Sequence, residues 1–213
     1  MDVASAEADK ASPRNLNRCE VAIFIAYTLP PDAEARGYDD WLRRVDNPFF
    51  NSIPGVHQYT NWKIGSFDRG SVNGWTHFDF LGLLSESDMD RVWFSPQLTE
   101  FRANWVKEWG PPVGNASEVF SHTYLLKSGG ALPPLPSDNV TVSFGNGLPS
   151  NPDASLQLSH TMRKHWVRDV ADRPGPWLIP AADYNPLGLD WVAFGHDPAA
   201  ATVVRCSRVA GVD

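Results

Sequence analysis

Cysteine, basic residues and long apolar runs are all scarce in this sequence, and each shortage excludes a class of protein. Only two of the 213 residues are cysteines, Cys19 and Cys206. They lie far apart without a metal-binding spacing, so we expect two free thiols. No apolar run reaches the roughly 18 residues of a membrane-spanning helix. The formal net charge of −7 argues against nucleic acid or an anionic membrane as partner, because either requires a basic surface.

Recognisable cofactor and targeting motifs are also missing. Residues 1–18 lack the apolar core of a secretory signal, so we expect a cytoplasmic protein. The segments GGALPP and FGNGLP match neither a phosphate-binding loop nor a dinucleotide fingerprint, and no nucleophile elbow is present. His160 and His165, five residues apart, are poorly spaced for one helix face. The sequence therefore predicts neither a metal nor a cofactor.

What the chain does contain is apolar and aromatic: 42% of its residues are hydrophobic and nine are tryptophan, enough for a substantial core. Its most informative stretch is residues 38–63. A helical stripe is predicted by the spacing i, i+3, i+4 and i+7 of Tyr38, Trp41, Leu42 and Val45. Pro48 should end this helix, because proline has no N–H to donate. Pro54-Gly55 predicts a turn, and the alternating residues 56–64 predict a strand.

The first two thirds of the chain predict the order strand, helix, strand, strand, helix, strand. The expected strands are residues 20–27, 56–64, 75–84 and 119–127, and Ser85 and Ser95-Pro96 are expected to begin helical segments between the last two. The loop at residues 66–74 is rich in turn-forming residues. We therefore predict an α+β fold that contains the element order βαββαβ.

The rest of the chain has two interpretations. We divide the sequence into an arm (residues 1–17), an α+β domain (18–128), a linker (129–138) and a C-terminal part (139–213). In the last part, residues 140–144, 189–196 and 202–209 predict strands and residues 158–170 a helix, and Arg173-Pro174-Gly175-Pro176 echoes the turn at residue 54. This part is either a degenerate second repeat of the first domain, or an extension of it.

One motif resembles a known family. The pattern Asp46-x-Pro48-Phe49-x-x-Ile53-Pro54-Gly55-Val56, at the end of the first helix, is similar to the dimeric α/β-barrel superfamily. Within it, the pattern is most similar to REDY-like proteins of pigment biosynthesis, and more distantly to EthD-type and antibiotic-biosynthesis-monooxygenase-type domains. The resemblance covers about residues 18–128 and implies that they form a ferredoxin-like βαββαβ domain of a dimeric α/β barrel, hence a homodimer, around a small, often aromatic substrate. In such a barrel, a second repeat at residues 139–213 would close the barrel within one chain, whereas an extension would cover a barrel closed by homodimerisation. It carries no catalytic residue that can be transferred.

Candidate site residues follow from strand alternation. We expect Phe78 and Phe80 to pack in the core, which leaves their neighbours on the sheet face turned away from the helices. His77, Asp79 and His122 are the predicted catalytic groups, because imidazole and carboxylate side chains move protons. The predicted substrate-binding residues are Tyr59, Asn61, Tyr124, Trp75, Phe24 and Tyr27.

Each candidate also has a structural interpretation, and the function has alternatives. Asp79 stands in an otherwise apolar strand, where a carboxylate is costly to bury unless it is paired; an ion pair with Lys63 or an arginine would suffice. The leading hypothesis is a cofactor-free acid–base enzyme, of lyase, cyclase or isomerase type, for a hydrophobic phenolic molecule. The alternatives are a cofactor-independent monooxygenase and a non-catalytic protein that binds an aromatic ligand.

Overall fold

The computed structural model describes residues 18–71, 74–85, 87–93, 95–109, 119–125, 139–151, 155–158 and 191–211. Its first four strands are β1 (Val21–Tyr27), β2 (Val56–Arg69), β3 (His77–Leu83) and β4 (Val119–Leu125). The helical segments are α2 (Tyr38–Trp41), the π-helical turn η2 (Leu42–Asp46), α3 (Asn47–Ser52), α4 (Asp88–Trp93) and α5 (Pro96–Trp109). The later strands are β5 (Asn139–Gly145), β6 (Ser155–Leu158), β7 (Trp191–Phe194) and β8 (Thr202–Ala210).

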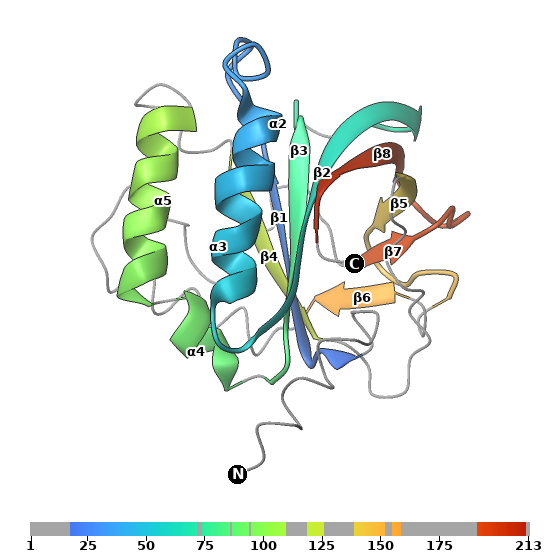
Figure 1. Cartoon of the computed structure of the whole chain (residues 1–213). Coiled ribbons are helices and arrows are strands. Elements are labelled where there is room, and N and C mark those ends of the chain that lie inside the picture. Colours follow the sequence, from blue (N-terminus) through green and yellow to red (C-terminus); the bar gives the residue numbers. More distant parts are fainter. Residues whose placement is uncertain are drawn as a thin grey trace.

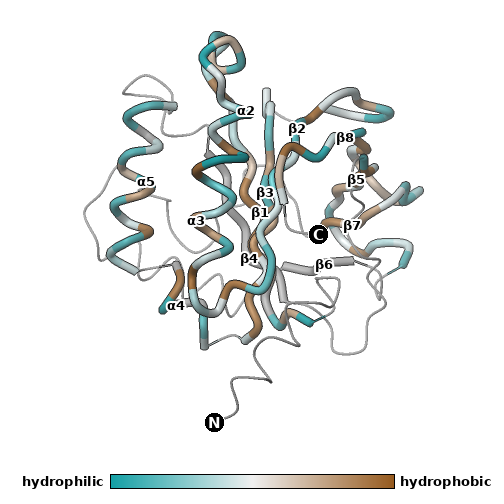
Figure 2. Tube along the Cα trace, viewed as in Figure 1, coloured by the Kyte–Doolittle hydropathy of each residue, from teal (hydrophilic) through white to brown (hydrophobic). Residues whose placement is uncertain are grey.

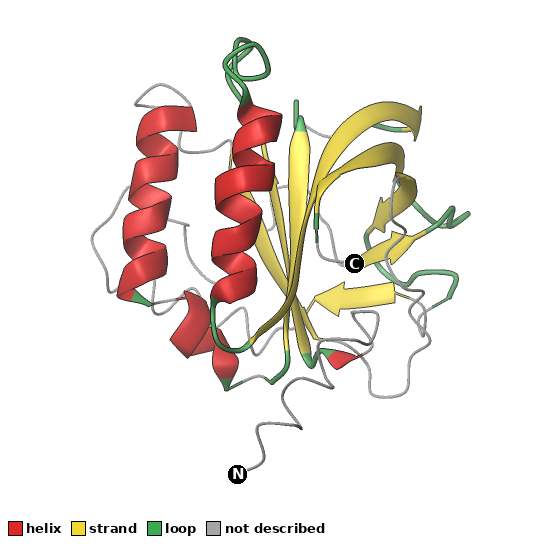
Figure 3. Cartoon of the chain, in the orientation of Figure 1, coloured by secondary structure: helices red, strands yellow, loops and turns green. Residues whose placement is uncertain are grey.

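The strands form one closed antiparallel barrel in the order β1-β3-β2-β8-β5-β7-β6-β4. The helices lie on one flank, outside the first four strands (Figures 1 and 3). The first four strands have the ferredoxin-like order β4-β1-β3-β2, and the fold is α+β with a curled antiparallel sheet, as predicted. Closure takes place within the chain, because β8 pairs with β2 and β6 pairs with β4.

The described side chains that point into the barrel are mostly apolar and come from both parts of the chain. One buried cluster joins Phe24 of β1 and Phe78 of β3 to Phe144 of β5 and Val204 of β8. The ring centroid of Phe24 lies 5.5 Å from that of Phe78 and 5.4 Å from that of Phe144. A closed barrel of eight strands is just wide enough for side chains to fill. The described residues therefore line the interior with packed apolar side chains.

A second apolar layer lies between the sheet and the helices. Alternate residues of the same strands point outward, among them Ile23 and Leu81, and they pack against Phe50 of α3 and Leu98 of α5. Tyr27 belongs to a neighbouring cluster with residues of α2 and α5. In Figure 2 the central strands β1 and β3 are hydrophobic over much of their length, because both of their faces are covered.

Several local predictions are confirmed. Gly55 has a φ of 97°, the left-handed conformation that the Pro54-Gly55 turn requires. The Ser95 hydroxyl accepts a hydrogen bond from the Leu98 amide at 3.1 Å, so Ser95 caps α5 as expected, with Pro96 as its first residue.

The first helix differs from the prediction, because it does not end at Pro48. After Trp41 it widens into η2, where the Asn47 amide bonds to the carbonyl oxygen of Leu42, and it then continues as α3 with Pro48 in its first turn. A proline is tolerated in a first turn because its missing N–H has no partner there. The extra residue of the π turn leaves Val45 43% exposed and buries Asp46, so the predicted apolar stripe is wrong at Val45.

Two strands also differ from the prediction. β2 continues to Arg69, through part of the expected loop, because Ser66, Phe67 and Arg69 pair with β8. Leu158, expected to begin a helix, ends β6. The rest of that expected helix, the Arg173-Pro174 echo, the arm and the linker lie outside the described residues, and the domain boundaries remain predictions. Within the described ranges, no helix combines the length and apolarity needed to cross a membrane.

Candidate functional site

The predicted polar residues of β2 and β3 share one sheet face, but it is the face covered by the helices. Asn47 of α3 donates to Asn61 of β2, whereas Phe78 and Phe80, neighbours of Asp79, lie in the barrel interior. The expectation that this set faces away from the helices is therefore wrong. The closed barrel takes the bulky apolar side chains inside, and polar helix residues satisfy the groups on the outer face.

Asp79 is the centre of this site. Its carboxyl group is buried and accepts hydrogen bonds on both oxygens. Oδ2 accepts from the hydroxyl of Tyr59 at 2.9 Å. Oδ1 accepts from the amide of Asn61 at 2.9 Å and from the hydroxyl of Tyr27 at 3.3 Å. Lys63, the expected ion-pair partner, instead bonds Glu34 and Asp39. Asp79 is therefore held by phenol and amide donors.

A second buried carboxyl, that of Asp46, shares a donor with Asp79. The Nδ2 group of Asn61 donates to Asp46 Oδ2 at 2.8 Å and to Asp79 Oδ1 at 2.9 Å. An amide nitrogen carries two protons, so one amide can bridge the two carboxyls. Asp46 reaches this position because the π turn rotates it toward the sheet, and π-helical turns are frequent at functional sites.

The orientation of Asn61 is set by two further amides from α3. Asn47 Nδ2 donates to Asn61 Oδ1 at 2.8 Å, and Asn51 Nδ2 donates to Asn47 Oδ1 at 2.9 Å. Asn51 is itself oriented by the backbone amide of Tyr59, which donates to its Oδ1 at 3.1 Å. The side-chain oxygens of Asn51, Asn47 and Asn61 each accept a hydrogen bond. Their side-chain nitrogens therefore donate to the next member, and the series ends at the two carboxyls.

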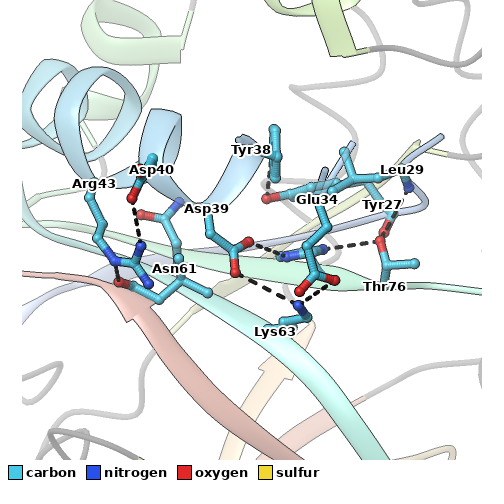
Figure 4. A network of polar contacts seen from close by, with 12 residues as sticks. Tyr27, Leu29, Glu34, Tyr38, Asp39, Asp40, Arg43, Asn61, Lys63 and Thr76 are labelled. Atoms are coloured by element: carbon cyan, nitrogen blue, oxygen red, sulfur yellow. Dashed lines mark hydrogen bonds and ion pairs between the residues drawn. The ribbon is translucent and has the colours of Figure 1, made fainter. Parts of the chain in front are cut away.

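A series of rings approaches Asp79 from the other side. Trp105 Nε1 donates to the hydroxyl oxygen of Tyr38 at 3.0 Å, and Tyr38 donates to the hydroxyl oxygen of Tyr27 at 3.1 Å. Tyr27 then donates to Asp79. Figure 4 shows the bond from Tyr38 to Tyr27 beneath α2.

His77 lies beside this series, toward the protein surface. Its ring stacks on Tyr27 at a centroid distance of 5.8 Å. Its Nε2 lies 3.4 Å from Asp39 Oδ1, and its Nδ1 lies 3.1 Å from Thr76 Oγ1. A carboxylate only accepts, so the Nε2 proton faces Asp39. Lys63 Nζ lies 3.7 Å from Asp39 Oδ2 and 2.9 Å from Glu34 Oε2, and Figure 4 shows it between these two carboxylates.

Burial dominates the electrostatics of the site. It raises the pKa of Asp46 to about 7, against the opposing effect of hydrogen bonds from Tyr59 and Asn61. It also raises the pKa of Asp79 well above the ordinary range, and the negative charge of Asp46 adds to this rise. Burial lowers the pKa of His77 to about 4, which nearby Asp39 only partly offsets. The group that titrates near neutral pH is therefore a carboxyl of the pair, while His77 is neutral.

The structure brings together five of the predicted residues: Tyr27, Tyr59, Asn61, His77 and Asp79. Trp75 lies apart from them, because it precedes β3 and its ring packs against Phe24 and Phe144 in the interior cluster. Phe24, another predicted residue, lies in that cluster too.

The two predicted residues of β4 are placed by backbone register alone. His122 is paired with Phe24 and Tyr124 with Ala22, both inward-facing positions of β1, whereas Asp79 is paired with Ile25. The side chains of His122 and Tyr124 lie outside what the structure describes, so their roles remain predictions.

Sequence reasoning missed four members of the site, namely Tyr38, Asp46, Asn47 and Asn51. The available signal was polarity: Asp46, Asn47 and Asn51 sit where a helix that covers a sheet should be apolar. Within the described part of the chain, no group of three or more His, Cys, Asp or Glu side chains is placed to hold a metal ion.

Comparisons with known proteins give only distant likenesses. No protein-family model matches the sequence, and no curated protein matches it significantly. Among solved structures, the chain is similar to an anthrone oxidase-like protein, with 10% identity and a TM-score of 0.41 over 91% of this chain and 74% of the other. It is also similar to a chlorite dismutase-like protein, with 14% identity and a TM-score of 0.37 over 92% of this chain and 96% of the other.

Proposed function

We propose that this protein is a cofactor-free acid–base enzyme for a hydrophobic aromatic or phenolic small molecule, of lyase, cyclase or isomerase type. The observation that carries the proposal is the buried pair of carboxyls, Asp79 and Asp46, which share the amide of Asn61. Two buried carboxyls so close cannot both ionise readily, because each charge opposes the other. Burial raises the pKa of Asp79 well above its ordinary range and that of Asp46 to about 7, so near neutral pH Asp79 holds a proton while Asp46 can release and take up one.

The chemistry follows from these two protonation states. The ionised carboxyl removes a proton from a phenol or an activated C–H group of the substrate, and the electron pair of that bond remains on the substrate. The proton returns to another substrate atom to complete an isomerisation, cyclisation or bond cleavage. Tyr27 and Tyr59 stabilise negative charge as hydrogen-bond donors. Burial excludes water that would compete for the proton.

The surroundings of the pair favour an aromatic substrate. Tyr38 contacts Tyr27 edge to face, with centroids 6.2 Å apart, and Trp105 contacts Tyr27 in the same way at 5.5 Å. Aromatic rings favour such edge and offset contacts, so a phenolic ring that reaches the pair would meet ring edges of the kind it packs against. The resemblance of residues 46–56 to REDY-like proteins of pigment biosynthesis supports the same class.

The experiment is a proton-exchange screen in D₂O. Phenols, aromatic ketones and aromatic acids are incubated with the protein, and deuterium incorporation and products are followed by NMR and mass spectrometry. We expect exchange or conversion of at least one class. Positioned acid–base groups contribute about 100- to 10,000-fold, so Asp79→Asn should lower the rate about 100-fold or more, and Asp46→Asn should also lower it.

The matched control is Asp68→Asn, which removes a carboxylate that pairs with Arg205 at the protein surface and should keep the full rate. Wild-type rates in folded Asp79→Asn and Asp46→Asn variants would refute the assignment. Oxygen uptake during turnover would favour the monooxygenase alternative. Compounds that bind tightly but are recovered unchanged, without deuterium, would favour a binding protein.

A further inference from the structure

Two hydrogen-bond series with a fixed direction end at Asp79. In the first, the indole N–H of Trp105 can only donate, so the oxygen of Tyr38 accepts from it at 3.0 Å. Tyr38 has one proton, which it gives to Tyr27 at 3.1 Å, and Tyr27 gives its own proton to Asp79 at 3.3 Å. An ionised Asp79 only accepts, so Tyr27 donates to it and in turn accepts from Tyr38, and every bond of this series points toward Asp79.

The second series runs through amides and arrives from the opposite side. Asn51 donates to Asn47, Asn47 donates to Asn61, and Asn61 donates to Asp79 and Asp46. Hydrogen bonds in series polarise one another, which strengthens each bond by about 10–30%. Each series therefore increases the positive charge on the proton that its last member presents to the carboxyl.

We propose that Tyr38, held by Trp105, is a positioning residue that sets how strongly Asp79 binds its proton, acting through Tyr27. This inference rests on the proposed function, in which the proton on Asp79 is the one transferred. Tyr38 comes from α2 and Trp105 from α5, so the helix layer and the chemistry on β3 are linked by this series. A donor to a carboxylate favours its charged form. Loss of the Tyr38 hydroxyl therefore makes Asp79 hold its proton more tightly.

Other titratable groups also face Asp79 and must be kept constant. They are Tyr27 on β1, Tyr59 on β2, Asp46 at the end of η2 and Tyr38 on α2, with His77 two residues away on β3. Tyr59 provides the matched comparison, because it donates to the other oxygen of Asp79, Oδ2, whereas Tyr27 donates to Oδ1.

The test is the titration of Asp79 in protein labelled with ¹³C at aspartate carboxyls, without any ligand, with Asp79→Asn to assign the signal. We expect Tyr38→Phe to raise the proton affinity about two- to fourfold. Trp105→Phe should act in the same direction but less. Added to Tyr27→Phe, Tyr38→Phe should have no further effect, whereas Tyr38→Phe and Tyr59→Phe should be additive.

If Asp79 stays protonated over the accessible pH range, the infrared band of its C=O group, taken as a difference against Asp79→Asn, replaces the titration. Tyr38→Phe should then shift this band to higher frequency, because the hydrogen bond from Tyr27 weakens. An unchanged midpoint and band in folded Tyr38→Phe would overturn the inference, and so would full additivity with Tyr27→Phe. Because no substrate is present, this result is separate from the success or failure of the D₂O screen.

Discussion

At the scale of single residues, the unusual feature is the burial of two carboxyls whose hydrogen bonds come from uncharged groups. Tyr27, Tyr59 and Asn61 supply the bonds to Asp79, and Asn61 supplies a bond to Asp46. Hydrogen bonds offset part of the cost of burial, but an unpaired charge in the interior remains expensive. The protein lowers that cost by retaining a proton on the pair, and this retention has consequences for stability.

The first prediction concerns Asp46. Because its pKa rises to about 7 on folding, from an ordinary value of about 3.9, the folded state binds more protons than the unfolded state between these pH values. Its contribution to the free energy of unfolding is therefore full at acidic pH and falls as the pH rises from about 4 to about 7, at up to about 1.4 kcal/mol per pH unit. Urea unfolding measures the free energy of unfolding of wild type and of Asp46→Asn across this range. The value for wild type minus that for the variant should fall as the pH rises. A constant difference would contradict the prediction.

His77 should have the opposite pH dependence. Its pKa falls to about 4 on folding, so between about pH 4 and 6.5 the unfolded state binds the additional proton. The folded protein therefore loses stability as the pH falls through this window. The variant His77→Gln has no such titration, so wild type should lose stability relative to the variant between pH 6.5 and 4 in the same urea series. Parallel profiles for the two proteins would show that the imidazole is not kept neutral by burial.

At the scale of elements, the turn η2 decides which helix residues reach the site. An α-helix turns by about 100° per residue, which would place Val45, seven residues after Tyr38, toward the sheet. The wider π turn inserts one residue, and Val45 is exposed while Asp46 and Asn47 are buried. The predicted apolar stripe of the helix is therefore correct up to Leu42 and wrong at Val45.

Deleting Val45 tests this account of the turn. Without it, an uninterrupted α-helix would place Asp46 seven residues after Tyr38, on the face toward Asn61. We expect a folded protein whose free energy of unfolding lies within about 1 kcal/mol of wild type, because the deleted side chain is 43% exposed. Thermal and urea unfolding measure this, and the pH dependence assigned to Asp46 should persist.

The matched control is deletion of Lys107, an exposed residue of the regular helix α5. There the deletion rotates buried Trp109 by about 100° away from its contacts, so it should cost clearly more than the deletion of Val45. Equal losses in the two deletion variants would mean that the π turn does not absorb one residue in the way described.

The elements show what the sequence could and could not predict. Strand alternation correctly grouped Tyr59, Asn61, His77 and Asp79 on one face, because the period of two depends on local geometry alone. Which face turns toward the helices depends on barrel closure by β5 to β8, a long-range event that no local pattern reports. The contribution of α3 was missed for a related reason: the polar Asn47 and Asn51 are buried by hydrogen bonds to β2 rather than by hydrophobicity.

At the scale of the whole molecule, the strand order repeats. The order β4-β1-β3-β2 is followed by β8-β5-β7-β6. The second four strands therefore occur in the same relative order as the first four, with β5 corresponding to β1 and β8 to β4. The two sets join at two seams, β2 with β8 and β4 with β6. Two ferredoxin-like sheets placed edge to edge produce this arrangement, and one chain supplies both of them here. Whether two chains associate further remains a prediction from the family resemblance.

The two seams are unequal, and this predicts where the barrel opens. At the first seam, partners run from Asn61 with Ala210 to Arg69 with Val203, and Arg43 of η2 adds a hydrogen bond to the carbonyl oxygen of Val209 at 3.1 Å. At the second seam, only Tyr124 with Leu158 and Leu125 with Gln157 are paired between the described strands. Regions with few paired backbone groups open at lower free energy, so the second seam should separate first.

Native-state hydrogen exchange, followed by NMR or mass spectrometry, measures this order directly. Amides of β6 and the paired end of β4 should exchange faster than those of β2 and β8, while β1 and β3, each paired on both sides, should exchange most slowly. The difference should disappear only in denaturant close to global unfolding, where every amide exchanges through the same transition. Faster exchange at β8 than at β6 would reverse the assignment. Opening would then begin on the side of the barrel where Arg43 joins the helix layer to β8, close to the carboxyl pair.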